Sequence, residues 1–197
     1  MIAADRVAAI LLAAGTSRRF GVADKLLAPL DGQPLVAHAA ATVAAMGFAH
    51  RIAVCASQDV AVSALLSSAG FDIARIGADG PDGHWPDMAA SLARGVAVAE
   101  GLDVDAVLLC LGDMPFITGE HLAALLAAHG AMPAAVTASS DGYAAMPPAL
   151  FGRGSFAALQ AMRGDRGGRA LLAQAVLVPA LPGLLRDIDR PADLSSR

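Results

Sequence analysis

An apolar run that leads directly into a glycine-containing basic loop is the feature that most constrains the fold of this chain. Every side chain in residues 7–14 is apolar, and the loop at 15–25 follows without a break. An uninterrupted run of this length is typical of a strand buried on both faces of a parallel sheet. Gly15 and Gly21 allow backbone conformations that a side chain would forbid, so several N–H groups can converge on one anion. The feature therefore predicts a buried strand that carries a phosphate-binding loop at its carboxyl end.

Positive charge in the same loop favours a polyphosphate ligand. Arg19 and Lys25 would make charge-assisted hydrogen bonds to a triphosphate and neutralise the charge that builds up on a departing pyrophosphate. The glycine spacing fits neither the dinucleotide pattern GxGxxG nor the P-loop pattern GxxxxGK[ST]. The missing GxGxxG, together with Lys25, disfavours a nicotinamide- or flavin-dependent oxidoreductase.

Beyond this loop, apolar β-prone runs alternate with alanine- and leucine-rich segments of helical length. The expected strands are 7–13, 51–56, 71–76, 106–111, 134–138 and 175–181, and the expected helices are 34–46, 61–69, 87–100, 118–129, 155–162 and 170–174. This order predicts an α/β fold with a mostly parallel sheet and helices on both faces, in one domain that spans residues 1–197. Ligands bind beyond the carboxyl ends of the strands in such sheets, so the loop at 15–25 and Asp113 are expected to share one site.

Composition and charge argue against two classes of partner. The net charge is −4 with only 14 Lys and Arg residues, so no basic field is available to hold nucleic acid. No apolar run approaches the roughly 18 to 20 residues of a membrane span, and no basic segment precedes the first run, so the expected location is the cytoplasm, with no membrane partner. Cys55 and Cys110 lie in apolar segments and are expected to be buried free thiols. The histidines that lack zinc-site spacing are interpreted as surface residues: His38, His50, His121 and His129.

Asp113 is the strongest candidate for a metal ligand. It follows the purely apolar strand expected at 106–111, where a carboxylate needs water, a hydrogen-bond donor or a cation. Mg²⁺ typically takes one or two carboxylates together with substrate phosphates, so a single Asp beside a phosphate loop is sufficient. We therefore expect Asp113 to bind magnesium. The alternative is a structural role, as an N-cap or turn residue before Met114 and Pro115.

Four motifs occur in order along almost the whole chain. They are the loop at 11–25, LGDMP at 111–115, GDRGGR at 164–169 and DIDRPAD at 187–193. Together they resemble the molybdopterin nucleotidyltransferase-like (MobA/MocA-like) NTP transferase family, whose members have a Rossmann-like, three-layer α/β/α fold. The resemblance implies a magnesium-dependent nucleotidyltransferase in which Lys25, Arg19 and Asp113 are the catalytic residues.

The resemblance also implies a set of nucleotide-binding residues at the first strand, its loop and the start of a helix. They are Leu12, Ala13, Ala14, Gly15, Thr16, Ser17, Arg19, Gly21, Lys25 and Ser91. In the family the segment that contains Ser91 commonly reads GMGxSL. Asp87 and Ala89 stand here where glycines are usual, so the match in this segment is partial.

Further ligand-binding residues are implied near the end of the chain. Arg166 and Arg169 lie among flexible glycines and suit a terminal phosphate on the acceptor, with an exposed surface loop as the alternative. Asp189 resembles a second metal-proximal position, and Asp187 is the competing choice because alternate residues of an extended segment share a face. Both carboxylates have the alternative of being solvated turn residues. Arg190 and Ala192 depart from the usual Thr-Pro-Glu-Asp, which weakens this motif.

The choice of nucleotide depends on one position in the first motif, and the family resemblance implies the acceptor. The segment Ala13-Ala14-Gly15 is similar to the LAAG of molybdenum cofactor cytidylyltransferases, whereas guanylyltransferases usually show LAGG. The resemblance therefore implies transfer of CMP from CTP to the terminal phosphate of molybdenum cofactor (molybdopterin), with release of pyrophosphate. The alternatives are GTP as donor, a sugar or polyol phosphate as acceptor, or a non-enzymatic carrier of molybdenum cofactor. A molybdenum hydroxylase is a further candidate partner.

Overall fold

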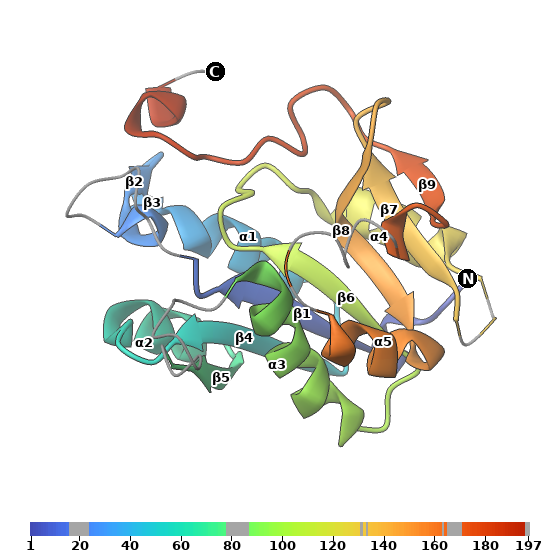
Figure 1. Ribbon diagram of the computed structural model, residues 1–197. Helices are drawn as coiled ribbons and strands as arrows, with labels where there is room; N and C mark the ends of the chain where they lie inside the picture. The colour runs from blue at the N-terminus through green and yellow to red at the C-terminus, as the bar shows by residue number, and fades with distance from the viewer. Residues whose placement is uncertain are drawn as a thin grey trace.

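A seven-stranded sheet forms the middle layer of the protein (Figure 1). The computed structural model describes residues 1–15, 24–77, 87–130, 132, 134–162, 164 and 171–195. In the order β5-β4-β1-β6-β8-β7-β9, the strands are Asp72–Ile76, His50–Ala56, Val7–Ala13, Ala106–Leu111, Ala145–Gly152, Val136–Ser140 and Val176–Pro179. Strand β8 runs antiparallel to β6 and β7, and the other neighbouring pairs are parallel. A separate two-stranded ribbon pairs β2 (Pro29–Leu30) with β3 (Gln33–Pro34).

Helices cover both faces of this sheet. One face packs against α1 (Leu35–Ala44), α2 (Val60–Ser68) and α4 (Gly119–Ala128), and the opposite face packs against α3 (Met88–Glu100) and α5 (Phe156–Ala161). Figure 1 shows α3 and α5 in front of the sheet. Short 3₁₀ turns complete the fold: η1 (Ala4–Arg6), η2 (Lys25–Leu27), η3 (Arg153–Ser155) and η4 (Pro191–Ser195). The architecture confirms the expected Rossmann-like α/β class.

Strand β1 is buried along its whole length because it lies between two strands and two helical layers. Ala9 and Leu11 point into the core on the α1 side, whereas Ala8 and Ile10 point into the core on the α3 side. Helix α3 lies very close to this strand. A Cβ atom built on Gly95 would lie 2.7 Å from Ile10 Cγ2, so the glycine permits the close packing.

The sequence pattern missed the antiparallel strand β8. Pro147 and Pro148 lie inside it, and proline removes a ladder hydrogen bond, which argues against a strand. The structure accommodates both prolines at an irregularity in the β7–β8 pairing, where the register shifts between Ala138 and Ser139. The helix expected at 170–174 extends beyond the described residues.

The interpretation of two histidines as surface residues is wrong. His121 and His129 are only 7% and 2% exposed, because α4 packs them against β7. Their rings contact hydroxyl groups of that strand, with His121 Nε2 lying 2.8 Å from Ser139 Oγ and His129 Nδ1 lying 3.0 Å from Thr137 Oγ1. The two cysteines are buried and free, as expected. Among the described residues, no helix has the length and apolar character needed to cross a membrane.

Candidate functional site

The carboxyl ends of β1 and β6 lie side by side. The first two motifs, at 11–25 and 111–115, therefore meet at one edge of the sheet. Leu12 pairs with Leu111 in the sheet, and the Gly112 N–H donates a hydrogen bond of 2.9 Å to the Leu12 carbonyl. A Cβ on Gly112 would lie 3.1 Å from that carbonyl oxygen and 3.2 Å from Val36 Cγ2. This close approach of two backbones favours glycine, and it places Asp113 directly beyond the end of β1.

Lys25 contacts two of the acids that the motifs predict. Its Nζ donates to Asp113 Oδ2 at 2.7 Å and to Asp189 Oδ1 at 3.1 Å. The Lys25 side chain is only 13% exposed. Burial alone would lower the pKa of Lys25, but the attraction of Asp113 and Asp189 outweighs it and the pKa is raised. The lysine is therefore held in its charged form between two carboxylates.

Local hydrogen bonds fix Lys25 and Asp189 in these positions. Asp24 caps η2 by accepting from the Leu26 N–H at 2.9 Å, which sets the backbone at Lys25. At the other end of the chain, Asp193 Oδ2 accepts from the N–H groups of Asp189, at 3.0 Å, and Arg190, at 2.7 Å. Asp24 and Asp193 therefore hold the backbone next to the two ion-paired residues, Lys25 and Asp189 respectively.

The C-terminal segment is attached to the LGDMP turn by its backbone. The Ile188 N–H donates to the Asp113 carbonyl at 3.0 Å, and the Ile188 side chain is fully buried against Leu30 and Leu35. In Figure 1 this segment runs along the upper edge of the molecule, from β9 to a position above β2. The acids Asp187 and Asp189 are brought to the end of β6 in this way.

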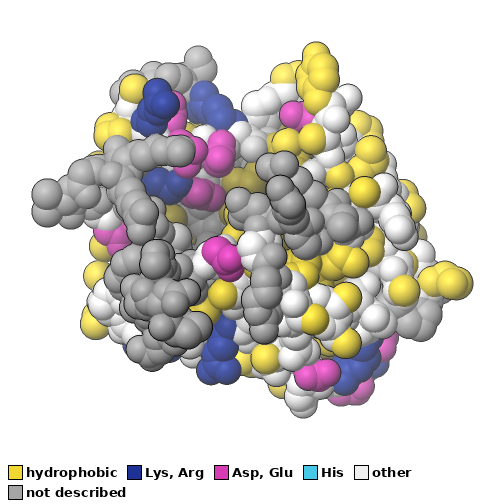
Figure 2. All heavy atoms as spheres, viewed as in Figure 1, with side chains coloured by type: hydrophobic (Ala, Val, Ile, Leu, Met, Phe, Trp, Pro, Cys, Tyr) yellow, Lys and Arg dark blue, Asp and Glu magenta, His cyan; other side chains and the backbone are white. Residues whose placement is uncertain are grey.

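Asp187 belongs to the same electrostatic cluster. Loss of solvent around its carboxylate raises its pKa, and the negative charges of Asp189 and Asp113 raise it further, although the residue as a whole is exposed. Figure 2 shows one group of acidic and basic side chains at the upper left of the face drawn and another at the lower right, with hydrophobic side chains over much of the right-hand side. Of the two competing acids, Asp189 is the one that contacts Lys25 directly.

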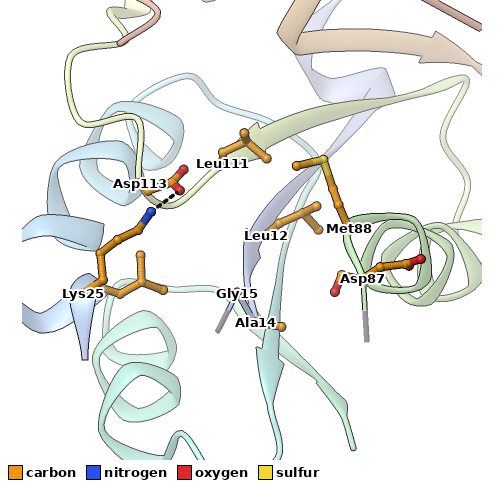
Figure 3. Close-up of a pocket in the computed structure, with 10 residues that line it drawn as sticks. Leu12, Ala14, Gly15, Lys25, Asp87, Met88, Leu111 and Asp113 are labelled. Atoms are coloured by element: carbon orange, nitrogen blue, oxygen red, sulfur yellow. Dashed lines mark hydrogen bonds and ion pairs between the residues drawn. The ribbon is translucent and has the colours of Figure 1, made fainter. Parts of the chain in front are cut away.

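A cavity of about 140 Å³ lies between these charged groups and the start of α3. It is lined by Leu12, Ala14, Gly15, Lys25, Leu26, Asp87, Met88, Ser91, Leu111 and Asp113. Figure 3 shows Lys25 and Asp113 on one side of this space, Asp87 and Met88 on the other, and the end of β1 between them. The cavity therefore has one strongly charged wall and one helical wall.

Most of the described site residues lie at this cavity, but several predicted residues do not. Leu12, Ala14, Gly15, Lys25, Ser91 and Asp113 line it, and Asp189 adjoins it through Lys25. Ala13 is 1% exposed and its side chain packs in the core on the α1 side, away from the cavity. Thr16, Ser17, Arg19, Gly21, Arg166 and Arg169 lie outside the described residues.

The conformational argument for Gly15 is wrong for this structure. Gly15 does not have a positive φ, and within the part of the chain that the structure describes no atom lies within 4 Å of a Cβ built on it. Its surroundings are open because the residue faces the cavity. The absence of a side chain leaves space for a ligand, and the backbone there does not require glycine.

Four lining residues were not among the predicted site residues, although Leu111 begins the LGDMP motif: Leu26, Asp87, Met88 and Leu111. Asp87 is the N-cap of α3, and its Oδ1 accepts from the Ala90 N–H at 2.7 Å. An acid directly before an apolar helical segment is a recognisable N-cap signal in the sequence. Its place in the cavity wall depends on how α3 packs across the sheet, which no local pattern encodes.

The two carboxylates that contact Lys25 fit a divalent cation. Both already converge on one positive charge, and carboxylate oxygens are the ligands that Mg²⁺ prefers. The described residues contain no group of three His, Cys, Asp or Glu side chains placed to hold a metal. A cation here would therefore combine one or two carboxylates with phosphate oxygens and water, which is usual for magnesium.

The chain is similar in sequence to known proteins. The bifunctional protein GlmU of Xanthomonas campestris pv. campestris (strain B100) is 33% identical over 141 residues, which are 68% of this chain but only 29% of GlmU. The purine catabolism protein PucB of Bacillus subtilis (strain 168) is 30% identical over 196 residues, which cover 93% of this chain and 92% of PucB.

Solved structures show the same fold. The crystal structure of Rv0371c from Mycobacterium tuberculosis H37Rv superimposes with a TM-score of 0.78 at 24% identity, over 99% of this chain and 97% of that one. The family model described as MobA-like NTP transferase domain matches residues 9–179, a span that includes most of β1, all residues that line the cavity, and β9. The chain therefore belongs to the MobA-like NTP transferase domain family and is a nucleotidyltransferase by fold and sequence.

Proposed function

We propose that this protein is a magnesium-dependent molybdenum cofactor cytidylyltransferase. In the reaction, an oxygen of the terminal phosphate of molybdopterin attacks the α-phosphorus of CTP. The bond from that phosphorus to the bridging oxygen breaks, and pyrophosphate leaves. The observation that carries the proposal is the contact of Lys25 with Asp113 and Asp189 beside a cavity at the ends of β1 and β6.

Asp113 and Asp189 are the residues that would hold the metal. When bound, a magnesium ion would neutralise phosphate charge and so make the α-phosphorus easier to attack. A manganese complex of the structurally similar Rv0371c protein, which is 24% identical to this chain, supports the choice of a divalent cation. Asp187 lies in the same negative cluster and strengthens its attraction for cations.

The ammonium group of Lys25 can pair either with the two carboxylates or with a bound triphosphate. Its ammonium pairs with Asp113 and Asp189, and a metal on the same oxygens would weaken those pairings. Lys25 would then turn its charge toward the triphosphate and stabilise the pyrophosphate as it leaves. Arg19 is proposed to assist from the loop that follows β1.

The wall formed by α3 would hold the nucleotide by backbone and hydroxyl groups. Ser91 is 4% exposed and lines the cavity from the first turn of the helix. Leu12, Ala14 and Gly15 present the end of β1, where the Ala-Ala-Gly sequence favours CTP over GTP. Arg166 and Arg169 remain our candidates for binding the acceptor's phosphate. The name of PucB makes an enzyme of purine catabolism a candidate recipient of the product.

The decisive experiment is incubation with each of the four nucleoside triphosphates, Mg²⁺ and molybdopterin, followed by mass measurement of the product and a pyrophosphate assay. Cytidylylated molybdopterin and pyrophosphate are expected with CTP. Product formed with GTP and with no other triphosphate would show that GTP, and not CTP, is the nucleotide donor. Product formed only when a sugar or polyol phosphate takes the place of molybdopterin would show that the acceptor is a sugar or polyol phosphate. Tight molybdopterin binding with no pyrophosphate from any triphosphate would identify a carrier and refute the enzyme.

A further inference from the structure

An uncharged and partly exposed strand forms one edge of the central sheet. Strand β9 is the last in the sheet order, and among the strands that the structure describes only β7 pairs with it (Figure 1). The segment 171–185, which contains β9, carries no charged residue, although 16% of the whole chain is charged. Edge strands are normally protected from pairing with other chains by charges or prolines. In β9 the only such residue is Pro179, at its end.

Large apolar side chains gather along this edge. Val176 and Leu177 are 55% and 51% exposed, and Leu181, two residues beyond the strand, is 76% exposed. Tyr143, in the turn between β7 and β8, is 96% exposed. These four residues, called the edge patch below, are half of the eight large hydrophobic residues that are exposed in the described part of the chain. Figure 2, in the same view as Figure 1, shows hydrophobic side chains over much of the right-hand side, where β7 and β9 lie.

The backbone of β9 also has hydrogen-bonding groups that point away from the sheet. The Ala180 N–H donates to the Ser140 carbonyl at 2.9 Å, so the backbone of Ala180 faces β7. Because these groups alternate in direction along a strand, the N–H and C=O of Leu177, three positions earlier, face the open edge. The contact at Ser140 also brings the end of β9 beside the turn that contains Tyr143. The open backbone and the exposed side chains therefore form one continuous surface.

We infer that the edge patch is the interface of a symmetric homodimer, in which β9 pairs antiparallel with β9 of a second copy. A twofold axis at Leu177 would place this residue opposite itself, and the two copies would exchange two N–H···O=C hydrogen bonds there. Such an axis brings charged residues close to their own copies, which is unfavourable. The absence of charge from residues 171–185 avoids this repulsion, although each copy has a net charge of −4. The dimer goes beyond the proposed function and does not depend on it.

The apolar area of the edge patch is close to what such a dimer needs. A whole side chain of these types corresponds to roughly 60 to 250 Å², so the exposed fractions of the patch amount to about 350 Å². A standard interface buries about 800 Å² on each partner, and about 65% of a homodimer interface is apolar. The patch therefore supplies most of the apolar area, and the exposed residues Ala173 and Pro179 add to it.

Opposite charges at Leu177 test the twofold axis. By light scattering, the wild-type protein is expected to approach twice its monomer mass of 19.8 kDa as the concentration is raised to about 100 µM. Leu177→Lys and Leu177→Glu should each weaken dimerisation by at least about 10-fold, because like charges meet at the axis. An equimolar mixture of the two variants should dimerise more tightly than either alone, because Lys then faces Glu. Val60→Lys, at a 67% exposed position on α2, is the matched control and should dimerise like the wild type.

A cysteine at the same position tests the geometry. The Cα atoms of a hydrogen-bonded antiparallel pair lie about 5.5 Å apart, within the range of about 4.4 to 6.8 Å that a disulfide spans. With oxidised glutathione, Leu177→Cys is therefore expected to form a disulfide-linked dimer on a non-reducing gel, whereas Val60→Cys is not. Cys55 and Cys110 are buried and do not compete. All variants should melt like the wild-type monomer, because both substituted positions are exposed.

Three results would overturn the inference. The first is a wild-type protein that remains monomeric at about 100 µM. The second is a dimer that is equally stable in the wild type, Leu177→Lys and Leu177→Glu, because the interface would then lie elsewhere. The third is equal cross-linking of Leu177→Cys and Val60→Cys, which would show that β9 does not face its own copy.

Discussion

Lys25 and Asp113 are 88 positions apart in the sequence, and their side chains meet at 2.7 Å. The contact joins the loop after β1 to the turn after β6, and Asp189 joins the same ammonium from the C-terminal segment. Three separate motifs thus converge on one charge cluster. Because a metal and Lys25 would use the same carboxylate oxygens, each should influence how tightly the other is held.

Asp113→Asn is expected to reduce pyrophosphate release by at least about 100-fold, because the neutral amide loses charge stabilisation of the metal and the transferring phosphoryl group. The fold should survive, since Lys25 keeps its contact with Asp189. Pyrophosphate assay and thermal melting check the two statements. Asp103→Asn is the matched control, because the Asp103 side chain is 93% exposed and its partner is Arg6, outside the cavity. Full activity in Asp113→Asn would refute the metal assignment.

Lys25→Met should have opposite effects on metal binding and on catalysis. Without nucleotide, removal of the competing ammonium leaves two carboxylates less neutralised, so Mn²⁺ is expected to bind several-fold more tightly by calorimetry. With CTP present, turnover should fall by more than about 10-fold, because a charge-assisted contact is worth about 1.5 to 3 kcal/mol. Weaker Mn²⁺ binding in the variant would show that Lys25 does not compete for the metal's ligands.

Gly95→Ala tests the close packing of α3 on β1. Alanine is favoured over glycine inside a helix by about 1 kcal/mol, which alone would stabilise the protein. The added Cβ would lie 2.7 Å from Ile10 Cγ2 and 3.1 Å from Val54 Cγ2, and overpacking of this kind typically costs about 1 to 3 kcal/mol. We therefore expect a net loss in the free energy of unfolding, measured by urea denaturation. At Gly101, where the nearest atom to a Cβ lies at 3.7 Å, the same substitution should be nearly neutral.

The sequence predicted those parts of the fold that depend on local, uninterrupted patterns. Strands β1 and β6 begin and end at the predicted residues, because both are apolar on two faces, follow a charged residue and have a glycine within two residues of their end. Strand β8 was missed because its prolines are tolerated only through an irregular pairing with β7. His121 and His129 were misplaced because their burial depends on how α4 meets β7.

The candidate site, like the fold, could be predicted from the sequence only in part. Motif order singled out Lys25, Asp113 and Asp189, and the structure brings all three together. The apolar cavity of about 230 Å³ between α3, α5 and β8 was not anticipated, because its lining combines residues of α3, β6, β8 and α5 with three residues that follow α5, and no local pattern brings these together. The contact from Asp87 to Gly164 likewise joins positions 77 apart and has no local signal.

Stability should decline in mild acid because of two buried histidines. Burial lowers the pKa of His121, and burial together with the N-terminal ammonium lowers the pKa of His129. In the unfolded chain a histidine titrates near about 6.5, so below this pH the unfolded state binds protons that the folded state resists. The contribution of the two neutral histidines to the free energy of unfolding is therefore complete above about pH 6.5. It is lost as the pH falls toward the lowered pKa values that these histidines have in the folded state.

The double variant His121→Gln, His129→Asn isolates this effect. Gln and Asn offer polar atoms near the positions of Nε2 and Nδ1, which contact Ser139 and Thr137, but neither side chain titrates. Urea denaturation at pH 7.5 and pH 5.0 should show a smaller loss of unfolding free energy in the double variant than in the wild type. An equal acid-induced loss in the wild type and the double variant would place the pH dependence elsewhere, since the two substitutions remove both lowered histidine pKa values and no other ionisable group.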